Sequence, residues 1–311
     1  MTIVLGAMGR CSGESWTQEI QSLKEHSTTK KIWFITGSSR GFGRIWTDAV
    51  LKRGDLVAAS ARKVADLADL KECFGDAVLP LELDVTNADQ AQRAVAEAHD
   101  HFGGLDVILN NAGYSLVGTI EEASETDVRA VFDANFFGML RVIQAALPFL
   151  RKQGSGHILT VSSSLGIAAM PLIGFHCSTK WAIEGLHESL AQEVQGFGIK
   201  VTLIEPGAYA TDLGSPQSLK IAPGIDVYAD LRQRVFGRLS TAERGDPQAT
   251  PEAILKIVDT ENPPLRFIVG SAGLPMARAA YADRLATWEA WEAISNAAQG
   301  EPKKGTVASL S

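Results

Sequence analysis

The sequence predicts an α/β protein: one Rossmann-type, doubly wound parallel β-sheet of about seven strands with helices on both faces. Short apolar runs recur along the chain, and helix-length segments such as 88–102 and 126–150 separate them. A glycine-rich turn directly follows the first run, as the first βα turn of such a fold requires. The seven expected strands are the runs 31–37, 55–61, 77–83, 105–110, 157–163, 199–207 and 265–270.

No linker divides the pattern, so we expect a single domain from residue 31 to 298. Residues 1–30 are expected to be an N-terminal extension and residues 299–311 a tail. The segment 212–244 lacks a strand pattern and mixes Gly and Pro with apolar residues, which is typical of a loop. Its apolar residues are Leu219, Ile221, Ile225, Val227, Tyr228 and Leu231.

Composition excludes several classes of protein. The chain has 311 residues, 45% of them apolar and 21% charged, and a net charge of −7, which argues against nucleic-acid binding. No secretory signal is evident, and no uninterrupted apolar run reaches the roughly 18 residues of a membrane span, so no membrane partner is expected. The three cysteines show neither a disulfide framework nor metal-ligand spacing, so we expect no metal and a cytoplasmic location.

The glycine turn reads TGSSRGFG and places Gly37, Gly41 and Gly43 between the first strand and the following helix. Glycine allows a tight turn and a close approach of backbone to a pyrophosphate, whose charge is favoured at a helix N-terminus. An ordinary strand-to-helix turn is the alternative. The position after the first strand of an alternating pattern favours a nucleotide site.

The end of the second strand bears on which nucleotide binds. A fold that selects NAD normally has an acid there, to hold the ribose 2′-hydroxyl. This strand instead ends AASARK, with Arg62 in place to clamp a 2′-phosphate and Arg40 in the glycine turn as a second cation. Both arginines could also be solvated surface residues. The pattern predicts NADP(H), with NAD(H) as the less favoured cofactor.

With these motifs in order, the chain resembles the short-chain dehydrogenase/reductase family over about residues 31–210. Asp84 matches the family's adenine contact, the NNAG motif at 110–113 its fourth-strand motif, and PGAYATD at 206–212 the segment over the nicotinamide. The resemblance implies NADP(H)-dependent interconversion of a ketone and a secondary alcohol, and a homodimer or homotetramer. The implied cofactor residues are Gly37, Ser39, Arg40, Gly41, Gly43, Arg62, Asp84, Asn111, Ala112, Gly113, Lys180, Pro206, Gly207 and Thr211.

The implied catalytic set departs from the family at one position. Asn135, Ser163 and Lys180 match the family's asparagine, serine and lysine, but His176 stands where the family has its catalytic tyrosine. In the family the tyrosine exchanges the proton of the substrate oxygen. Imidazole is a good general acid or base, yet it ends roughly 2 Å short of a phenol oxygen, and misplacement by about 1 Å can cost about 100-fold in rate. A neighbouring Lys180 cation also disfavours imidazolium.

Three interpretations follow from His176. The chain is an oxidoreductase with impaired proton transfer, an oxidoreductase in which histidine works through water or an adapted substrate, or a catalytically inactive cofactor-binding sensor or scaffold. The intact Asn135, Ser163 and Lys180 favour an enzyme. The segment 212–244 lies where the family carries its substrate lid. Its apolar residues, with Leu172 and Phe175, suit a moderately sized apolar substrate.

Five further residues receive structural interpretations. We expect Cys177 to be a small buried residue and His157 and His187 to lie at the surface or at strand ends. Trp288 and Trp291 share one helical face with Leu285 and are expected in core or subunit packing.

Overall fold

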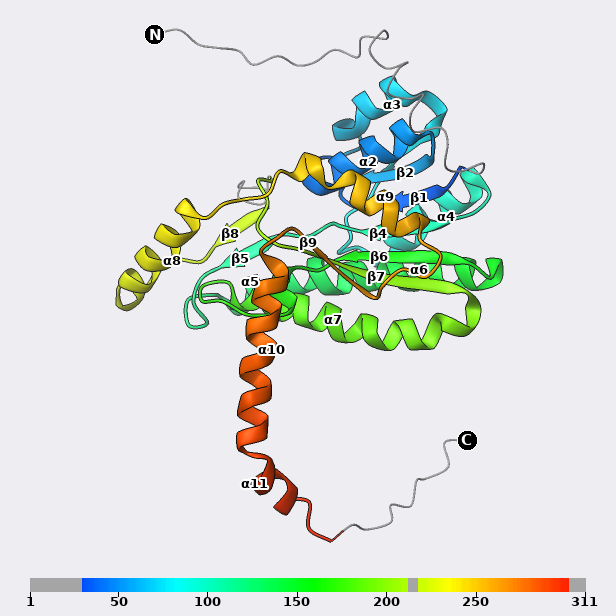
Figure 1. Cartoon of the computed structure of the whole chain (residues 1–311). Helices are drawn as coiled ribbons and strands as arrows, with labels where there is room; N and C mark the ends of the chain where they lie inside the picture. Colours follow the sequence, from blue (N-terminus) through cyan, green and yellow to red (C-terminus); the bar gives the residue numbers. More distant parts are fainter. Residues whose placement is uncertain (1–29, 212–217, 302–311) are drawn as a thin grey trace, which may run out of the picture.

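The computed structural model describes residues 30–211 and 218–301. The extension up to residue 29, residues 212–217 of the expected lid and the tail from residue 302 lie outside the described residues. A seven-stranded parallel sheet in the order β3-β2-β1-β4-β6-β7-β9 forms the centre of the molecule (Figure 1). Its strands are β1 Ile32–Ile35, β2 Leu56–Ala61, β3 Val78–Glu82, β4 Val107–Asn110, β6 Gly156–Val161, β7 Ile199–Pro206 and β9 Arg266–Val269.

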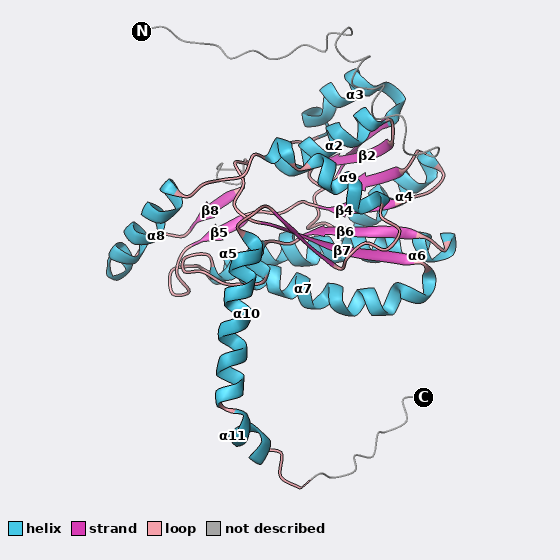
Figure 2. Ribbon diagram, in the orientation of Figure 1, coloured by secondary structure: helices cyan, strands magenta, loops and turns pink. Residues whose placement is uncertain are grey.

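The strand order confirms the predicted doubly wound sheet, because the chain runs outward from β1 in one direction and then returns to continue from β4 in the other. Every neighbouring pair is parallel, with Phe34 of β1 opposite Ala58 of β2 and Ile108 of β4. These strands read as continuous apolar runs because helices cover both of their faces (Figure 2). All seven runs expected from the sequence form strands of this sheet.

Ten helices and a π-helical turn follow or separate the strands in the described residues. The helices are α2 Gly41–Arg53, α3 Ala68–Phe74, α4 Ala88–Phe102, α5 Glu125–Phe132, α6 Gly138–Gln153, α7 Gly174–Val194, α8 Ala229–Thr241, α9 Pro251–Asp259, α10 Gly273–Ala290 and α11 Glu292–Ala297. The π-helical turn Asp133–Phe137 joins α5 to α6.

Two apolar cores lie on opposite faces of the sheet. On one face, α4, α6 and α7 contribute side chains such as Val95, Val142 and Ile183. On the other face, α2 and α9 contribute side chains such as Trp46 and Ile254. Helices packed on both faces therefore hold the strands in place. The loops at the carboxyl ends of the strands lie outside these cores and can carry polar groups.

The segment Glu125–Gln153 is also long and apolar enough, by length and composition, to cross a membrane. Its apolar residues Val142, Ile143, Ala146 and Leu150 instead join the core beneath the sheet, where α6 packs against α4. The apolar stripe of this helix is therefore accounted for by the packing of the domain.

A second, two-stranded sheet was not predicted from the sequence. It pairs β5 Ser115–Val117 with β8 Leu219–Ile221, so the end of the NNAG loop is tied to the segment expected as a lid. Both strands have three residues, too short to show an alternating pattern. α8 and α10 project away from the central sheet (Figure 1).

Burial bears on three sequence interpretations. His157, expected at the surface or at a strand end, lies at the start of β6 and is 4% exposed, with a ring nitrogen 2.9 Å from the Thr202 hydroxyl. The same expectation was wrong for His187, which lies within α7 and is 0% exposed, with a ring nitrogen 2.7 Å from the Thr160 hydroxyl. Trp288 and Trp291, expected in core or subunit packing, are both 62% exposed and do not belong to the core. Cys177 is buried as expected, and burial raises the pKa of its thiol.

Candidate active site

The glycine turn leads from β1 into the N-terminus of α2. Gly37 has φ +71°, and a side chain on Gly43 would meet the Gly37 carbonyl oxygen at 2.2 Å, so the chain can close this turn only with glycine at both positions. Gly41 has φ +56° and nothing within 4 Å of the place where its Cβ would stand. The backbone therefore leaves open space directly at the N-terminus of a 13-residue helix, a favourable place for a phosphate.

The NNAG loop braces this turn from β4. Asn111 donates its side-chain amide to the Thr36 carbonyl oxygen at 3.0 Å, and the amides of Asn111 and Ala112 both donate to the Thr36 hydroxyl, at 2.9 and 3.0 Å. A Cβ on Gly113 would lie 2.9 Å from Asn135 Oδ1, so glycine lets this loop approach the π-helical turn. The sequence analysis did not single out Thr36, whose hydroxyl and carbonyl oxygen hold the NNAG loop against the glycine turn.

At the end of β2, Arg62 and Lys63 are exposed, and Arg62 directly follows the last strand residue, Ala61. Arg40 is the N-cap residue of α2, and Ser39 lies beside it in the same turn. On the neighbouring strand-end, Asp84 Oδ1 accepts hydrogen bonds from the amide and hydroxyl of Thr86, at 3.0 and 2.7 Å. Arg40 thus lies in the glycine turn and Arg62 at the end of the neighbouring strand β2.

Asn135 lies in the π-helical turn between α5 and α6, and such turns frequently mark functional sites. Its side chain is 3% exposed. Its amide donates to the Tyr114 carbonyl oxygen at 2.9 Å and to the Thr179 hydroxyl at 3.2 Å, and its Oδ1 accepts from the Tyr114 amide at 2.9 Å. Asn135 thus joins the loop after NNAG to α7.

Ser163 follows the end of β6, and Lys180 binds the last residue of that strand. Ser163 caps the 3-10 turn Ser164–Gly166, where its Oγ accepts from the Leu165 amide at 3.1 Å. Lys180, in the second turn of α7, donates its ammonium to the Val161 carbonyl oxygen at 2.7 Å. Burial lowers the pKa of Lys180 to about 8, and the Glu184 carboxylate opposes this shift.

His176 lies one helical turn before Lys180 and is 6% exposed. Its Nδ1 lies 3.2 Å from the hydroxyl oxygen of Ser115 on β5, and within the described chain no hydrogen bond joins it to Ser163. Burial, followed by the charge of Lys180, lowers the pKa of the imidazole to about 3. The side chain at the tyrosine position is therefore neutral near pH 7, and its partner is Ser115, which the sequence analysis did not single out.

The segment after β7 closes the other side of the site. Pro206 is buried at the end of β7, and the Gly207 amide donates to the Val269 carbonyl oxygen at 3.1 Å. Thr211, whose amide donates to the Tyr209 carbonyl oxygen at 2.9 Å, ends the described part of this loop. The structure thus brings the sequence-predicted residues of β1, β4, β6, α7 and β7 to the carboxyl edge of one sheet.

The segment expected as a lid is anchored but open. The Ile225 amide donates to Glu122 Oε1 at 3.0 Å, and the same carboxylate pairs with Arg232 of α8. Ile221 and Val227 are 60% and 76% exposed, so most of the surface of these apolar residues is open to solvent. Leu172 has φ +67° and its carbonyl oxygen accepts from Gly118 at 2.7 Å, which fixes the loop before α7 in a strained conformation.

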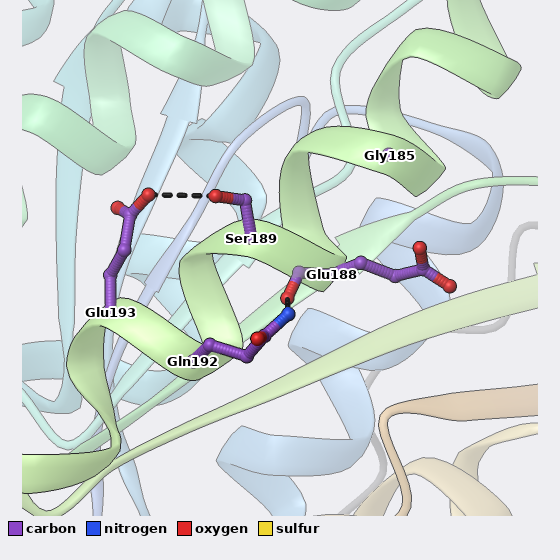
Figure 3. Close-up of a pocket in the computed structure, with 5 residues that line it drawn as sticks. All are labelled: Gly185, Glu188, Ser189, Gln192 and Glu193. Carbon is purple, nitrogen blue, oxygen red and sulfur yellow. Dashed lines mark hydrogen bonds between the residues drawn. The ribbon is translucent and has the colours of Figure 1, made fainter. Parts of the chain in front are cut away.

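A hollow on the outer face of α7 does not belong to this site. Figure 3 shows it lined by Gly185, Glu188, Ser189, Gln192 and Glu193, with a hydrogen bond of 2.7 Å from Ser189 to Glu193. Its polar lining is on the side of the helix that faces away from the sheet. The catalytic candidates are instead on the inner side of the first two turns of α7.

Comparison with known proteins identifies the family. Residues 31–221 match the family model described as short chain dehydrogenase. Oxidoreductase BOA17 of Botryotinia fuckeliana is 39% identical over 85% of this chain and 98% of its own, and 3-ketodihydrosphingosine reductase of Bacteroides thetaiotaomicron is 36% identical over 77% and 88%. The chain therefore belongs to the short-chain dehydrogenase/reductase family, and these relatives are named as an oxidoreductase and a reductase.

Solved structures agree with this assignment. A short-chain dehydrogenase from Streptomyces avermitilis superposes with a TM-score of 0.81 at 34% identity, over 87% of this chain and 99% of its own. A short-chain dehydrogenase from Burkholderia cenocepacia, solved in complex with NADP, has a TM-score of 0.67 at 26% identity, over 84% and 96%. The open glycine turn and the helix N-terminus of the present chain fit a nicotinamide dinucleotide of this kind.

Proposed function

We propose that this protein is an NADP(H)-dependent reductase that interconverts a ketone and a secondary alcohol on a moderately sized apolar substrate, with impaired proton transfer because His176 replaces the family's tyrosine. The carrying observation is an intact set of Asn135, Ser163 and Lys180 around a neutral, buried imidazole. The bound nicotinamide would supply the hydride. The protein's own residues would hold the substrate oxygen and exchange its proton.

The cofactor preference is supported by charge. Arg62 at the end of β2 and Arg40 at the start of α2 are placed to pair with a 2′-phosphate, and Arg62 occupies the position at which NAD-selective folds carry an acid. The NADP found in the Burkholderia cenocepacia structure supports the same choice.

The substrate class is supported by the walls of the site and by one relative. The exposed apolar side chains Ile221, Ile225 and Val227 belong to the segment that follows the nicotinamide loop. Closure of this segment over an apolar substrate would remove them from water, which is favourable by about 25 cal/mol per Å². The name of the Bacteroides thetaiotaomicron relative describes reduction of a ketone on a sphingoid base, a largely apolar molecule.

The state of His176 supports impaired rather than normal proton transfer. Reduction of a ketone needs a proton donor at the substrate oxygen, and an imidazole with a pKa of about 3 is not protonated near neutral pH. For alcohol oxidation the same low pKa makes the imidazole a weak base. The serine and lysine can still orient the oxygen, so residual turnover is expected from positioning alone.

Replacement of His176 by tyrosine tests the proposal. We expect His176→Tyr to raise kcat on a panel of apolar aryl and alkyl ketones with NADPH by about 10- to 1,000-fold, the effect of a positioned general acid, while NADPH binding changes little. Stopped-time product analysis measures turnover, and nicotinamide fluorescence measures binding. His176→Phe, similar in bulk but without a proton to exchange, is the matched control and should stay at or below the parent rate.

The possible outcomes separate the three interpretations of the sequence. A parent that turns over at rates usual for enzymes, and loses activity in His176→Tyr, would show that histidine is the working acid and base. Uptake of NADPH by both proteins with no turnover of any ketone would indicate a cofactor-binding role without catalysis. Either result overturns the proposal.

A further inference from the structure

A buried polar cluster lies directly behind the catalytic candidates, and the sequence motifs of the family do not include it. Its centre is Glu184 of α7, one helical turn after Lys180 and 6% exposed. One carboxylate oxygen accepts a hydrogen bond from the Ser162 hydroxyl, and the other accepts from Arg266 Nε of β9 at 3.0 Å. A single carboxylate therefore joins α7 to two strands of the sheet.

Glu184 holds the residue that lies between the end of β6 and Ser163. The carbonyl oxygen of Val161, the last residue of β6, accepts from Lys180 at 2.7 Å, and the hydroxyl of Ser162, directly after the strand, donates to Glu184. Two side chains one turn apart on α7 thus bind two consecutive residues at the end of β6. Ser163 is the next residue, so its position relative to α7 depends on both contacts.

The packing around this contact leaves no room for adjustment. A Cβ on Gly166 would lie 2.8 Å from Ser162 Oγ and 3.0 Å from Glu184 Oε1. The 3-10 turn that Ser163 caps therefore closes over the carboxylate, and only glycine at residue 166 permits this approach. Loss of the Glu184 to Ser162 contact would loosen the turn that carries Ser163.

The charges around Lys180 come from three elements. On α7 are His176, Glu184 and, one turn further, Glu188; on β7 is Glu205; on β9 is Arg266. Arg266 binds Glu188 at 2.7 Å and lies 3.4 Å from the fully buried Glu205. Burial, and then the charge of Glu184, raise the pKa of Glu205 to about 8. Glu184 is the buried acid one helical turn from Lys180.

We propose that Glu184 is a positioning residue of the active site: its hydrogen bond with Ser162 fixes Ser163, and its charge favours the ammonium form of Lys180. The proposal deepens the proposed function, since it assumes that Ser163 and Lys180 serve in carbonyl reduction. Glu184 itself touches neither substrate nor cofactor in this scheme.

The electrostatic role is tested without any assay of turnover. In protein labelled with ¹³C at the lysine ε-carbon, the Lys180 resonance is assigned by its loss in Lys180→Arg and titrated with pH. Glu184→Gln keeps the shape and an oxygen for Ser162 but removes the charge, so we expect the Lys180 midpoint to fall by about one pH unit. Glu188→Gln removes a half-exposed charge one turn further along α7. It should shift the Lys180 midpoint by less than about a third of the shift caused by Glu184→Gln.

The positioning role is tested by kinetics in the parent and in His176→Tyr. Ser162→Ala removes the hydrogen bond but keeps the charge, and we expect kcat to fall about tenfold with KM and the pH profile unchanged, because Ser163 is displaced. Glu184→Gln should instead move the alkaline limb of kcat to lower pH. Thermal unfolding and NADPH binding show whether each variant is folded.

Each result decides one part of the proposal. A Lys180 midpoint that stays the same in Glu184→Gln overturns the electrostatic role, and an unchanged kcat in Ser162→Ala overturns the positioning role. Absence of turnover in parent and His176→Tyr alike defeats the proposed function, while the Lys180 titration still tests Glu184. If Glu184→Gln does not fold, the comparison of Ser162→Ala with Glu188→Gln retains the test of positioning.

Discussion

The imidazole Nδ1 of His176 lies 3.2 Å from the hydroxyl oxygen of Ser115, and both side chains are buried. Ser115 belongs to β5, whose neighbour β8 lies in the segment expected as a lid, and the Ser115 amide donates to the Ser218 carbonyl oxygen at 2.9 Å. The residue at the tyrosine position is therefore tied to the strand that pairs with this segment. A displacement of β5 would also displace His176.

The energy of this contact can be measured by a double-mutant cycle. We expect Ser115→Ala to lower the free energy of unfolding by about 1 to 2 kcal/mol, because it leaves a buried ring nitrogen without its partner. In a His176→Phe background, the loss in the free energy of unfolding caused by Ser115→Ala should be about 1 kcal/mol smaller. Urea denaturation of the four proteins gives the coupling. Strict additivity would mean that the hydrogen bond contributes nothing to stability.

Arg62 should control the choice between the two nicotinamide cofactors. Arg62→Asp removes a cation from the 2′-phosphate site and supplies an acceptor for a ribose hydroxyl, so we expect the preference to move from NADPH towards NADH by about 10- to 100-fold. Fluorescence titration with both cofactors measures it. Lys152→Asp makes the same change of charge at the exposed end of α6, at the opposite edge of the sheet. It should leave the ratio of the NADPH and NADH affinities unchanged. Equal affinities in the parent would contradict the assignment of Arg62.

Buried histidines should make the fold sensitive to acid. The pKa values of His157 and His176 are lowered to about 3 and that of His187 to about 4, mainly by burial, whereas an unfolded histidine titrates near 6.5. Between these values the unfolded chain binds more protons than the folded one, so stability falls as the pH falls below about 6.5. Each histidine contributes a slope of up to about 1.4 kcal/mol per pH unit.

Glu205 acts in the opposite direction. Its pKa is raised to about 8, so the folded protein retains a proton that the unfolded chain releases above about pH 4.5, and this contribution to stability is lost as the pH rises towards 8. The two effects predict a stability maximum near pH 6 to 7. Urea unfolding from pH 4 to 9 tests it. His157→Gln should reduce the acid slope by about one proton, and an unchanged slope would show that His157 is protonated in the folded state.

The sequence predicted the fold well because each strand of the main sheet is an apolar run buried on both faces. It also placed Gly37, Asn135, Ser163 and Lys180 correctly at one edge, because motifs tied to strand ends keep their spacing. It missed Ser115, Glu184 and Glu205, whose partners are 61, 22 and 61 residues away along the chain. Such contacts depend on tertiary packing, which no local pattern encodes, although two acids in otherwise apolar segments were a usable signal.

Association with a second copy is the last expectation, and it rests on the family resemblance, which implies pairing through the helices at 126–150 and 175–197. Gly185 lies exposed on the outer face of α7, in the hollow of Figure 3, and nothing stands within 4 Å of the place where its Cβ would be. A side chain there is harmless to the isolated chain, but a large one would keep a second helix at a distance.

We expect Gly185→Arg to convert a dimer or tetramer into smaller species in light scattering at micromolar concentration, with NADPH binding retained. Gly237→Arg adds the same side chain at an exposed glycine of α8, outside the two pairing helices and also with nothing within 4 Å of its Cβ position, and serves as the control for the added charge. A parent that is already monomeric, or a Gly185→Arg protein that keeps its assembly, would show that α7 does not form the interface.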